Sequence, residues 1–412
     1  MRVDLLTKEY PPAVYGGAGV HVTELVKALR RSIEVQVRCF GQPRDEQDTT
    51  AYEVPAELAD ANGALQTLAV DLQIADAVAG TDVVHSHTWY ANEAGRLAQA
   101  LHGVPHVVSA HSLEPLRPWK AEQLGGGYRI SSDIERRAYE AADRVIAVSN
   151  GMRADILRSY PSLDPERVVT IYNGIDLDAW APNPDADRAR ELGLDPTHPS
   201  VVFVGRITRQ KGLPHLLRAA RALPEDVQLI LCAGAPDTPE IMAEVKALVA
   251  ELQTTREGVV WIDDVLPRED LRALLTHATT FVCPSVYEPL GIVNLEAMAC
   301  GAPVVGSGTG GIPEVIEDGV TGFVVPIEQV QDGTGTPTDP ARYEADLADA
   351  LTRMLADPEA AKRMGEAGRE RAREHFDWGR IAEETRALYA TVIAEHGAGA
   401  HGAAEQQPTG TP

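Results

Sequence analysis

Short runs of β-branched residues alternate with longer amphipathic stretches along almost the whole chain. Strands that run parallel in one sheet must be joined by crossovers, which are usually helices, so this alternation predicts a parallel α/β architecture. The runs fall into two series, and each series predicts one sheet. The expected strands are residues 3–6, 33–39, 83–85, 106–109, 145–148 and 168–171 in the first series, and residues 201–204, 229–232, 259–262, 281–283, 304–306 and 322–325 in the second.

The two series together are too long for one hydrophobic core. The chain has 412 residues, whereas single cores stop growing at roughly 250–300 residues. Residues 177–200 separate the series and contain four prolines, a composition typical of a linker. We therefore expect an N-terminal Rossmann-like domain over residues 1–176 and a C-terminal one over 201–375. Residues 396–412 offer little to bury and predict a disordered tail.

The charge of the chain excludes two classes of partner. Lys and Arg number 37 against 61 Asp and Glu, which gives a formal net charge of −24. Nucleic acids and anionic membranes require a basic protein face, so we expect neither as a partner. A small phosphate-bearing molecule needs only two or three local cations and stays compatible with this composition.

The cysteines predict no metal cluster and no disulfide framework. Cys39, Cys232, Cys283 and Cys300 lie far apart and form no C-x-x-C pair, which fits a reducing cytosol. The N-terminus lacks the apolar core of an export signal, and no apolar run approaches the ~18 residues of a membrane span. We expect a soluble protein of the cytoplasm.

Ligands of open parallel sheets bind at the carboxyl ends of the strands, so the residues after each strand are the candidates for a site. The loop Gly16-Gly17 follows the first strand and precedes a helix, whose N-terminus favours anions. A plain connecting turn is the alternative. A dinucleotide fold is set aside, because the glycine spacing is not G-x-G-x-x-G and the second strand ends beside Arg38 rather than at an acid.

Three histidines stand at the ends of two neighbouring strands of the first series. His85 and His87 lie two residues apart at the end of the third strand, and His111 follows the fourth. An H-x-H pair could hold a metal, but no third ligand is evident nearby, so packed or hydrogen-bonded histidines are favoured. His111 is the candidate for a functional role.

The first strand of the second series ends in a loop with two cations, Arg206 and Lys211. Two positive charges in one loop suit the neutralisation of a diphosphate. The alternative is a solvated surface pair. The position of the loop at a strand end, in an otherwise acidic chain, favours the phosphate site.

Two carboxylates flank a helix start after the strand at residues 281–283. A proline and a glycine prevent a regular helix before about Ile292, which places Glu288 on the loop and Glu296 one turn inside the helix. Both acids then border a helix N-terminus that suits a leaving diphosphate, unless Glu296 faces solvent. The amides at this N-terminus are those of Gly291, Ile292 and Val293.

Together these motifs resemble the retaining nucleotide-sugar glycosyltransferases of family 4, which have the GT-B fold of two facing Rossmann-like domains with a deep cleft between them. Glu288 to Glu296 matches the E-x7-E signature of the family, and residues 205–212 match its G-R-x4-K-G. Gly16-Gly17 matches its N-terminal glycine loop. Residues 376–382 match its closing segment, which implies a helix over 376–395 that returns to the N-terminal domain. The resemblance spans residues 1–395.

The resemblance also implies roles for individual residues. Arg206 and Lys211 would hold the donor phosphates and Glu296 the ribose. Glu288 would contact the transferred glucose, and His111 its 6-hydroxyl from the opposite domain. The other implied donor contacts are Gly16 and Gly17 at the diphosphate, Asn173 near the hinge, Val265 beside the base and the amides of Gly291, Ile292 and Val293. No cofactor besides the nucleotide sugar is implied and no metal, because the two cations stand where a magnesium ion would.

Within the family, residues 6–21 are similar to actinobacterial glycogen synthase homologues that make α-maltose 1-phosphate. Those enzymes move glucose from ADP-glucose to glucose 1-phosphate for glycogen and α-glucan synthesis. Lys8 departs from the Lys-x-Gly-Gly-Leu opening of ordinary bacterial glycogen synthases, so direct elongation of an α-1,4-glucan is the less favoured alternative, beside a small glycoside made from a UDP-sugar. Arg117 and Lys120 are candidates for the acceptor phosphate, or else surface charges.

Two other classes of protein are alternatives to a transferase. A glycoside hydrolase could use two glutamates, but it has no use for cations and amides aimed at a diphosphate. A sensor that binds a nucleotide sugar without catalysis would keep the binding residues, although the two glutamates with His111 favour an enzyme. We expect small-molecule partners, a nucleotide sugar and a sugar-phosphate or glucan acceptor, and leave a homodimer open.

Overall fold

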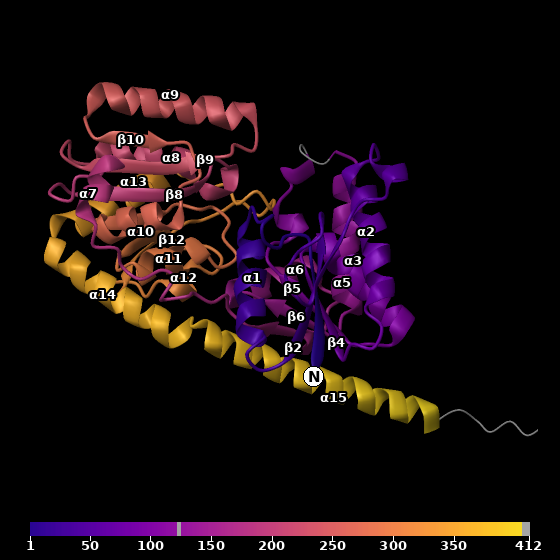
Figure 1. Cartoon of the computed structure of the whole chain (residues 1–412). Coiled ribbons are helices and arrows are strands. Elements are labelled where there is room, and N and C mark those ends of the chain that lie inside the picture. Colours follow the sequence, from indigo (N-terminus) through magenta and orange to yellow (C-terminus); the bar gives the residue numbers. More distant parts are fainter. Residues whose placement is uncertain (122–124, 406–412) are drawn as a thin grey trace, which may run out of the picture. The chain divides into compact units, whose positions relative to one another are not determined.

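The computed structural model describes residues 1–121 and 125–405, which divide into two compact units. Unit 1 consists of Met1–Val148, Met152–Gly174 and the C-terminal segment from Trp378. Unit 2 consists of Ser149–Gly151 and Ile175–Asp377. Each unit contains one parallel sheet with helices on both faces (Figure 1). The predicted α/β class is therefore confirmed for both series of strands.

The sheet of unit 1 has, among the described residues, seven parallel strands in the order β3-β2-β1-β4-β5-β6-β7. The order changes direction between β1 and β4, which pair directly with each other. The strands are β1 (Arg2–Thr7), β2 (Glu34–Phe40), β3 (Thr49–Tyr52), β4 (Val83–His87), β5 (His106–Ala110), β6 (Arg144–Ala147) and β7 (Val168–Thr170). All of these except β3 were predicted.

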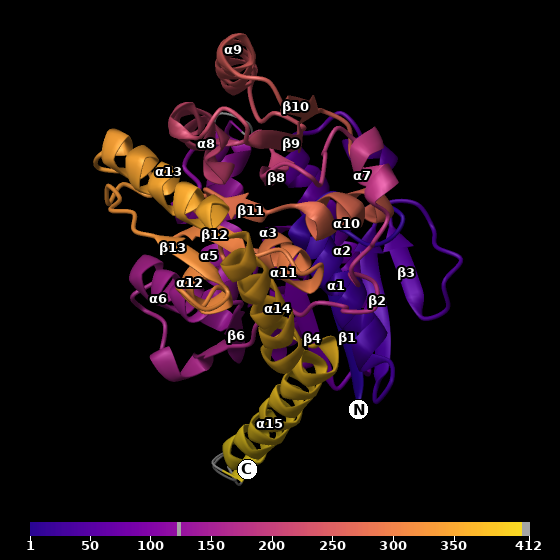
Figure 2. The ribbon, with the colours of Figure 1, turned by 90° about the vertical axis from the view of Figure 1, so that its left-hand side faces the viewer.

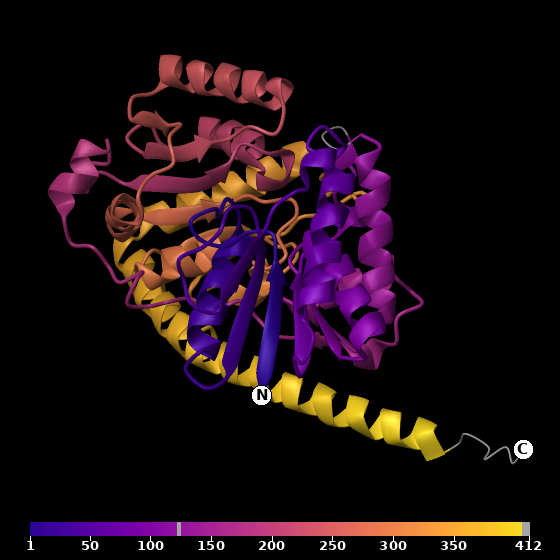
Figure 3. The ribbon, with the colours of Figure 1, turned by 45° about the vertical axis from the view of Figure 1, so that its right-hand side comes forward.

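Successive side chains of a strand point to opposite faces of the sheet, so the strands of unit 1 contribute to two cores, one on each face. Val3 and Leu5 of β1 face a core that includes residues of helices α1 and α15. Leu6 of the same strand points the other way, into a core with α2 and α3. Figure 3 shows the purple helices α2, α3 and α5 side by side. The helices of this unit are α1 (Gly17–Leu29), α2 (Gly63–Ala77), α3 (Trp89–His102), α5 (Gly127–Ala141), α6 (Asn150–Ser159), whose first two residues belong to unit 2, and α15 (Trp378–Glu405), with 3-10 turns η1 (Ala56–Leu58), η2 (Glu114–Leu116) and η3 (Pro165–Arg167).

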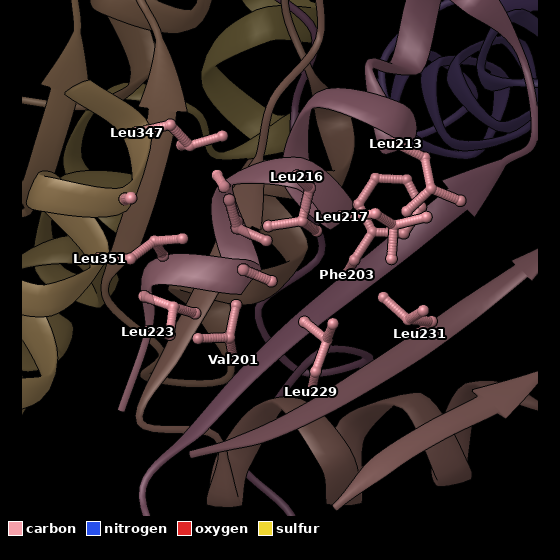
Figure 4. Close-up of a cluster of buried hydrophobic side chains, with 14 of the residues drawn as sticks. Val201, Phe203, Leu213, Leu216, Leu217, Leu223, Leu229, Leu231, Leu347 and Leu351 are labelled. Atoms are coloured by element: carbon pink, nitrogen blue, oxygen red, sulfur yellow. The ribbon is translucent and has the colours of Figure 1, made fainter. Parts of the chain in front are cut away.

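The sheet of unit 2 has the order β10-β9-β8-β11-β12-β13, and its strands are parallel. Val201 and Phe203 of β8 join Leu229 and Leu231 of β9 in a core with α8, α9 and α13 (Figure 4). The order changes direction between β8 and β11. The strands are β8 (Ser200–Arg206), β9 (Gln228–Gly234), β10 (Val259–Ile262), β11 (Thr280–Cys283), β12 (Val304–Ser307) and β13 (Gly322–Val325).

Helices cover both faces of this second sheet. Figure 2 shows α13 alongside β12, β13 and α8. The helices are α7 (Ala186–Glu191), α8 (Leu213–Ala219), α9 (Pro239–Thr255), α10 (Arg268–His277), α11 (Ile292–Ala299), α12 (Ile312–Val315), α13 (Pro340–Ala356) and α14 (Pro358–His375), with 3-10 turns η4 (Arg209–Lys211) and η5 (Ala220–Ala222). In the described part of the chain, no helix is long and apolar enough to cross a membrane.

Two segments differ from the sequence-based expectation. The linker at residues 177–200 contains α7, whose Arg188 binds Asp270 of α10 through two hydrogen bonds of 2.7 and 2.9 Å. The tail expected from residue 396 is helical as far as Glu405, because α15 runs on through an alanine-rich stretch and His396 bonds the Gly103 carbonyl. The rest of that predicted tail, residues 406–412, lies outside the described residues.

Candidate active site

Two loops meet in unit 2 where the strand order changes direction. Ligands of doubly wound sheets bind at such switch points. Gly212 ends the loop after β8 with φ of +65°, and a Cβ at this position would lie 1.9 Å from the Pro284 carbonyl oxygen. Glycine alone permits this approach, so the loops that follow β8 and β11 are held against each other.

Lys211 and Glu288 form an ion pair across these two loops. The Lys211 Nζ lies 2.6 Å from Glu288 Oε2, which also accepts a hydrogen bond of 3.1 Å from Ser285 Oγ. Glu288 is buried, with 6% of its surface exposed. Burial lowers the pKa of Lys211, but Glu288 and other neighbours outweigh that effect and the pKa ends above its usual value. Lys211 is therefore a fixed positive charge at the switch point.

Arg206, the second predicted cation, lies at the end of β8 and is half exposed. Its Nη2 lies 2.8 Å from Asp237 Oδ1. Both cations of this loop thus carry a carboxylate partner. An anionic ligand that binds here must draw Arg206 and Lys211 from their carboxylates or share them.

Helix α11 begins at Ile292, as predicted, and Glu296 lies in its second turn. Gly291 precedes the helix with φ of +94°, a conformation that favours glycine. Glu296 is partly buried, and burial raises its pKa to about 7, while Arg268 and Lys211 act in the opposite direction. The alternative that Glu296 merely faces solvent is wrong. Glu288 pairs directly with Lys211, whereas Glu296 is influenced by the charges of both Arg268 and Lys211.

In unit 1, the glycine loop is folded around a carboxylate that the sequence analysis did not single out. Glu9 follows β1 and is buried, and its Oε2 accepts the backbone N–H groups of Tyr15 at 3.0 Å and Gly16 at 2.8 Å. A Cβ on Gly19 would lie 2.7 Å from the same oxygen. The Gly16 amide, which the resemblance assigns to a diphosphate, is thus bonded to Glu9, and Gly17 begins helix α1.

Four histidines cluster at the carboxyl ends of β4 and β5. His87 Nδ1 lies 3.0 Å from His111 Nε2, and the rings of His85 and His87 contact each other in a tilted arrangement with centroids 4.2 Å apart. His21 of α1 lies edge-on to His111 at 4.7 Å. Burial lowers the pKa of all four, that of His111 to about 4. His111 is therefore a neutral hydrogen-bonding group in this cluster and not a cation.

One ring nitrogen each of His21, His87 and His111 lies within 4.8 Å of the others. The sequence argument against a metal was the lack of a third ligand near His85 and His87, and the structure corrects that reason. His21 supplies the third imidazole, whereas both ring nitrogens of His85 are bonded to Tyr389 and Ser109. That the protein works without a metal stays a prediction.

The remaining predicted residues lie at separate places. Asn173 is buried next to His21 in unit 1. Val265 follows β10 in unit 2 with 96% of its surface exposed, so its backbone is accessible. Arg117 is partly buried, donates from Nη1 to Ser112 Oγ and lies 3.9 Å from Glu114. The Lys120 amide donates to the Arg117 carbonyl.

Sequence reasoning missed several residues of these two clusters. His21 lies within the amphipathic pattern of α1, and nothing in that pattern separates it from a core position. Tyr389 belongs to α15 and reaches His85 over 304 positions of sequence. Glu9 is the exception, because it directly follows the dipeptide Thr7-Lys8 at the end of the first strand, where polar residues are informative.

Two family models match the chain. "Glycosyltransferase Family 4" matches residues 15–179 and "Glycosyl transferases group 1" matches residues 185–371. The chain is 56% identical to the α-maltose-1-phosphate synthases of Mycolicibacterium smegmatis and of Mycobacterium tuberculosis, over 96% of this chain and 100% of each relative. It is 38% identical to the D-inositol 3-phosphate glycosyltransferase of a Mycobacterium species, over 62% of this chain and 58% of that one.

Solved structures agree with this relationship. The sucrose-phosphate synthase of Thermosynechococcus elongatus is 25% identical, with a TM-score of 0.76 over 96% of this chain and 99% of that one. The catalytic domain of starch synthase IV from Arabidopsis thaliana shares the fold at 18% identity, with a TM-score of 0.73 over 95% of this chain and 99% of the other. Together with the two parallel sheets and the E-x7-E cluster, these matches show that the chain is a glycosyltransferase of family 4 with the GT-B fold.

Proposed function

We propose that this enzyme is a retaining α-glucosyltransferase that moves glucose from ADP-glucose to glucose 1-phosphate and so makes α-maltose 1-phosphate. The observation that carries the proposal is the 56% identity over 96% of the chain to two enzymes named for that product. The Lys211–Glu288 pair and Glu296 at the β8/β11 switch point support it, because they offer a cation for the donor phosphates and carboxylates for sugar hydroxyls. ADP-glucose is proposed as the donor on the resemblance of residues 6–21.

The cations at the switch point support departure of the nucleoside diphosphate. As the glycosidic C–O bond breaks, Arg206, Lys211 and the first amides of α11 would take up the negative charge that develops on the leaving phosphate oxygen. The acceptor hydroxyl would then form the new C–O bond on the face that the diphosphate leaves, and its proton would pass to a departing phosphate oxygen. Attack on that face retains the α configuration.

Glu288 and His111 are assigned to the sugar. Glu288 forms an ion pair with Lys211, and the lone pairs of its carboxylate that this pair leaves over can accept hydrogen bonds from glucose hydroxyls. His111 is neutral because burial lowers its pKa to about 4, which lets one ring nitrogen donate and the other accept. These roles stay part of the proposal.

The alternatives are direct elongation of an α-1,4-glucan and transfer from a UDP-sugar to a small acceptor. The 38% identity to a D-inositol 3-phosphate glycosyltransferase favours the second, although it covers only 62% of the chain. Purified enzyme should be offered ADP-, UDP- and GDP-glucose, each with glucose 1-phosphate or glycogen, and the products identified by mass and by the anomeric proton coupling. A disaccharide phosphate of α configuration, made fastest from ADP-glucose, is expected. Labelled glycogen without such a product would overturn the proposal.

A further inference from the structure

A lysine and a tyrosine flank the switch point of the unit 1 sheet. Lys8 directly follows β1, and Tyr90 lies at the start of α3 just after β4, the strand beside β1. The strand order changes direction between β1 and β4. Doubly wound sheets bind ligands at the carboxyl ends of the strands at such a point. The Lys8 Nζ lies 3.8 Å from the centre of the Tyr90 ring.

Lys8 is a partly buried cation that is not neutralised. Among residues 1–121 and 125–405, no carboxylate forms an ion pair with it, and its Nζ lies over the ring of Tyr90. The carboxylate next to it in sequence, Glu9, is occupied by the amides of Tyr15 and Gly16. Burial lowers the pKa of Lys8, with Glu9 opposing. An ammonium that has lost water without gaining an anion is stabilised by an anionic ligand.

Arg117 brings a second cation to the same edge of the sheet, because it directly follows η2 after β5, the strand that pairs with β4. Its guanidinium also opposes the rise that burial causes in the pKa of the Tyr90 phenol. Arg117 Nε is buried and has no hydrogen-bond partner within the described residues. It is an N–H donor of a guanidinium, which suits a phosphate oxygen.

The backbone that places Tyr90 is held in an uncommon conformation. Thr88, between β4 and α3, has φ of +63°, which is rare for a β-branched residue. Such residues cluster at ligand sites, where the surrounding structure maintains them. Thr88 turns the chain so that His87 joins the histidine cluster while Tyr90 lies under Lys8.

We propose that Lys8 and Arg117 together bind the phosphate of a sugar-phosphate acceptor, and that Lys8 makes the enzyme prefer this acceptor over an uncharged glucan. The inference rests on the proposed function, because it identifies the acceptor class of that site. Both the maltose 1-phosphate and the inositol 3-phosphate in the names of the relatives are phosphate monoesters. Two cations and a half-buried aromatic ring suit such a group and the sugar that carries it.

The test compares Lys8→Met, Lys8→Arg and wild type, with Lys246→Met as the matched control, because Lys246 lies exposed on α9 of unit 2. Loss of a charged hydrogen bond should raise the KM for glucose 1-phosphate by about tenfold to a hundredfold in Lys8→Met. We expect kcat, the KM for the donor and the rate of donor hydrolysis without acceptor to stay near wild type. Lys8→Arg should restore most of the affinity, and Arg117→Met should resemble Lys8→Met.

Inorganic phosphate provides a second probe. It should inhibit wild type competitively with glucose 1-phosphate, and its inhibition constant should rise in Lys8→Met by the same factor as the KM. An unchanged KM for glucose 1-phosphate, or a rise in the donor KM instead, would overturn the inference. If wild type transfers nothing to glucose 1-phosphate, the proposed function fails. Calorimetry of glucose 1-phosphate binding then decides the inference alone, since equal affinity in wild type and Lys8→Met contradicts it.

Discussion

The ammonium of Lys211 lies 2.6 Å from the carboxylate of Glu288, although the two residues belong to different loops of unit 2. The pair joins the end of β8 to the end of β11 across the switch point. A donor phosphate that binds Lys211 therefore acts on the charge balance of Glu288, the residue assigned to the transferred sugar. In the proposed function, this ion pair would couple donor binding to placement of the sugar.

Replacement of Lys211 by alanine should lower kcat by ~10²–10³ at saturating donor, because a preorganised charge that stabilises the leaving group is removed. The matched control is Arg209→Ala, an exposed cation in the same loop, which should keep near-normal turnover. Steady-state kinetics with saturating ADP-glucose checks both variants. Near-normal kcat in Lys211→Ala would show that the leaving group is stabilised elsewhere.

The donor affinity should depend on pH through Glu296. Burial raises the pKa of Glu296 to about 7, and the ionised form is the one that accepts hydrogen bonds from ribose hydroxyls. The ionised fraction falls from about one half at pH 7 to about one tenth at pH 6, so the donor KM should rise by up to about fivefold over this interval. Glu296→Gln should remove this dependence. A donor KM that varies equally in wild type and Glu296→Gln would assign the titration to another group.

Asp71→Asn should stabilise the protein. Asp71 of α2 is fully buried, and both carboxylate oxygens have no hydrogen-bond partner among the described residues. Burial, with Glu93 adding to it, raises the pKa well above its usual value. The folded state then binds a proton that the unfolded state releases above about pH 4, so stability falls as pH rises from there.

An amide does not ionise, so Asp71→Asn should increase the free energy of unfolding by about 1–3 kcal/mol near pH 8 and by less at pH 5. Thermal melts at the two pH values measure the difference. Asp76→Asn, on the exposed side of the same helix, is the control and should change little. A gain that is equal at both pH values would mean that ionisation of Asp71 is not the cause.

Tyr389→Phe should destabilise unit 1 and leave its fold intact. The Tyr389 hydroxyl lies 2.6 Å from His85 Nδ1, and both side chains are buried. Loss of the hydroxyl leaves a buried ring nitrogen unpaired, which costs about 1–3 kcal/mol. Chemical denaturation measures the change, with Thr391→Val at an exposed position of α15 as the control. Equal stability of Tyr389→Phe and wild type would show that His85 finds another partner.

Metal removal should leave the activity unchanged. In the proposed function, Arg206 and Lys211 neutralise the diphosphate, so no divalent ion is needed for that task. Assays in excess chelator, before and after dialysis, should give the same kcat. A strict requirement for a divalent ion, restored by its addition, would contradict the role given to the two cations and direct attention to His21, His87 and His111.

Most of the fold could be predicted because buried parallel strands are short runs of Val, Ile and Leu, and helices lie between them. The strand that was missed, β3 at Thr49–Tyr52, is a half-exposed edge strand with the sequence Thr-Thr-Ala-Tyr, so it lacks that signal. The helix start at Ile292 was predictable from the local chemistry of the preceding proline and glycine. The end of α15 was not predictable, because the stretch after residue 396 mixes alanines, which favour a helix, with glycines, which disfavour it.

The candidate site was predictable where both partners lie on strand-end loops and less so elsewhere. Arg206, Lys211, Glu288 and Glu296 stand at the ends of β8 and β11, and strand order brings them together. The use of the Gly16 amide was not predictable, because Glu9 folds back onto it through the intervening turn. His21 was missed because its partners, His87 at the end of β4 and His111 just after β5, lie 66 and 90 residues further along the chain.

Unit 1 is built from segments at opposite ends of the chain, and this has a consequence for its biosynthesis. Ile381, Tyr389 and Val392 of α15 complete the core against which β1, β2 and α1 pack. A nascent chain can close the sheet of unit 2 on the ribosome as soon as residue 375 has emerged, whereas the first-made strands must wait for the last helix. Premature termination anywhere before α15 therefore removes the α15 residues from this core and leaves His85 without the Tyr389 hydroxyl.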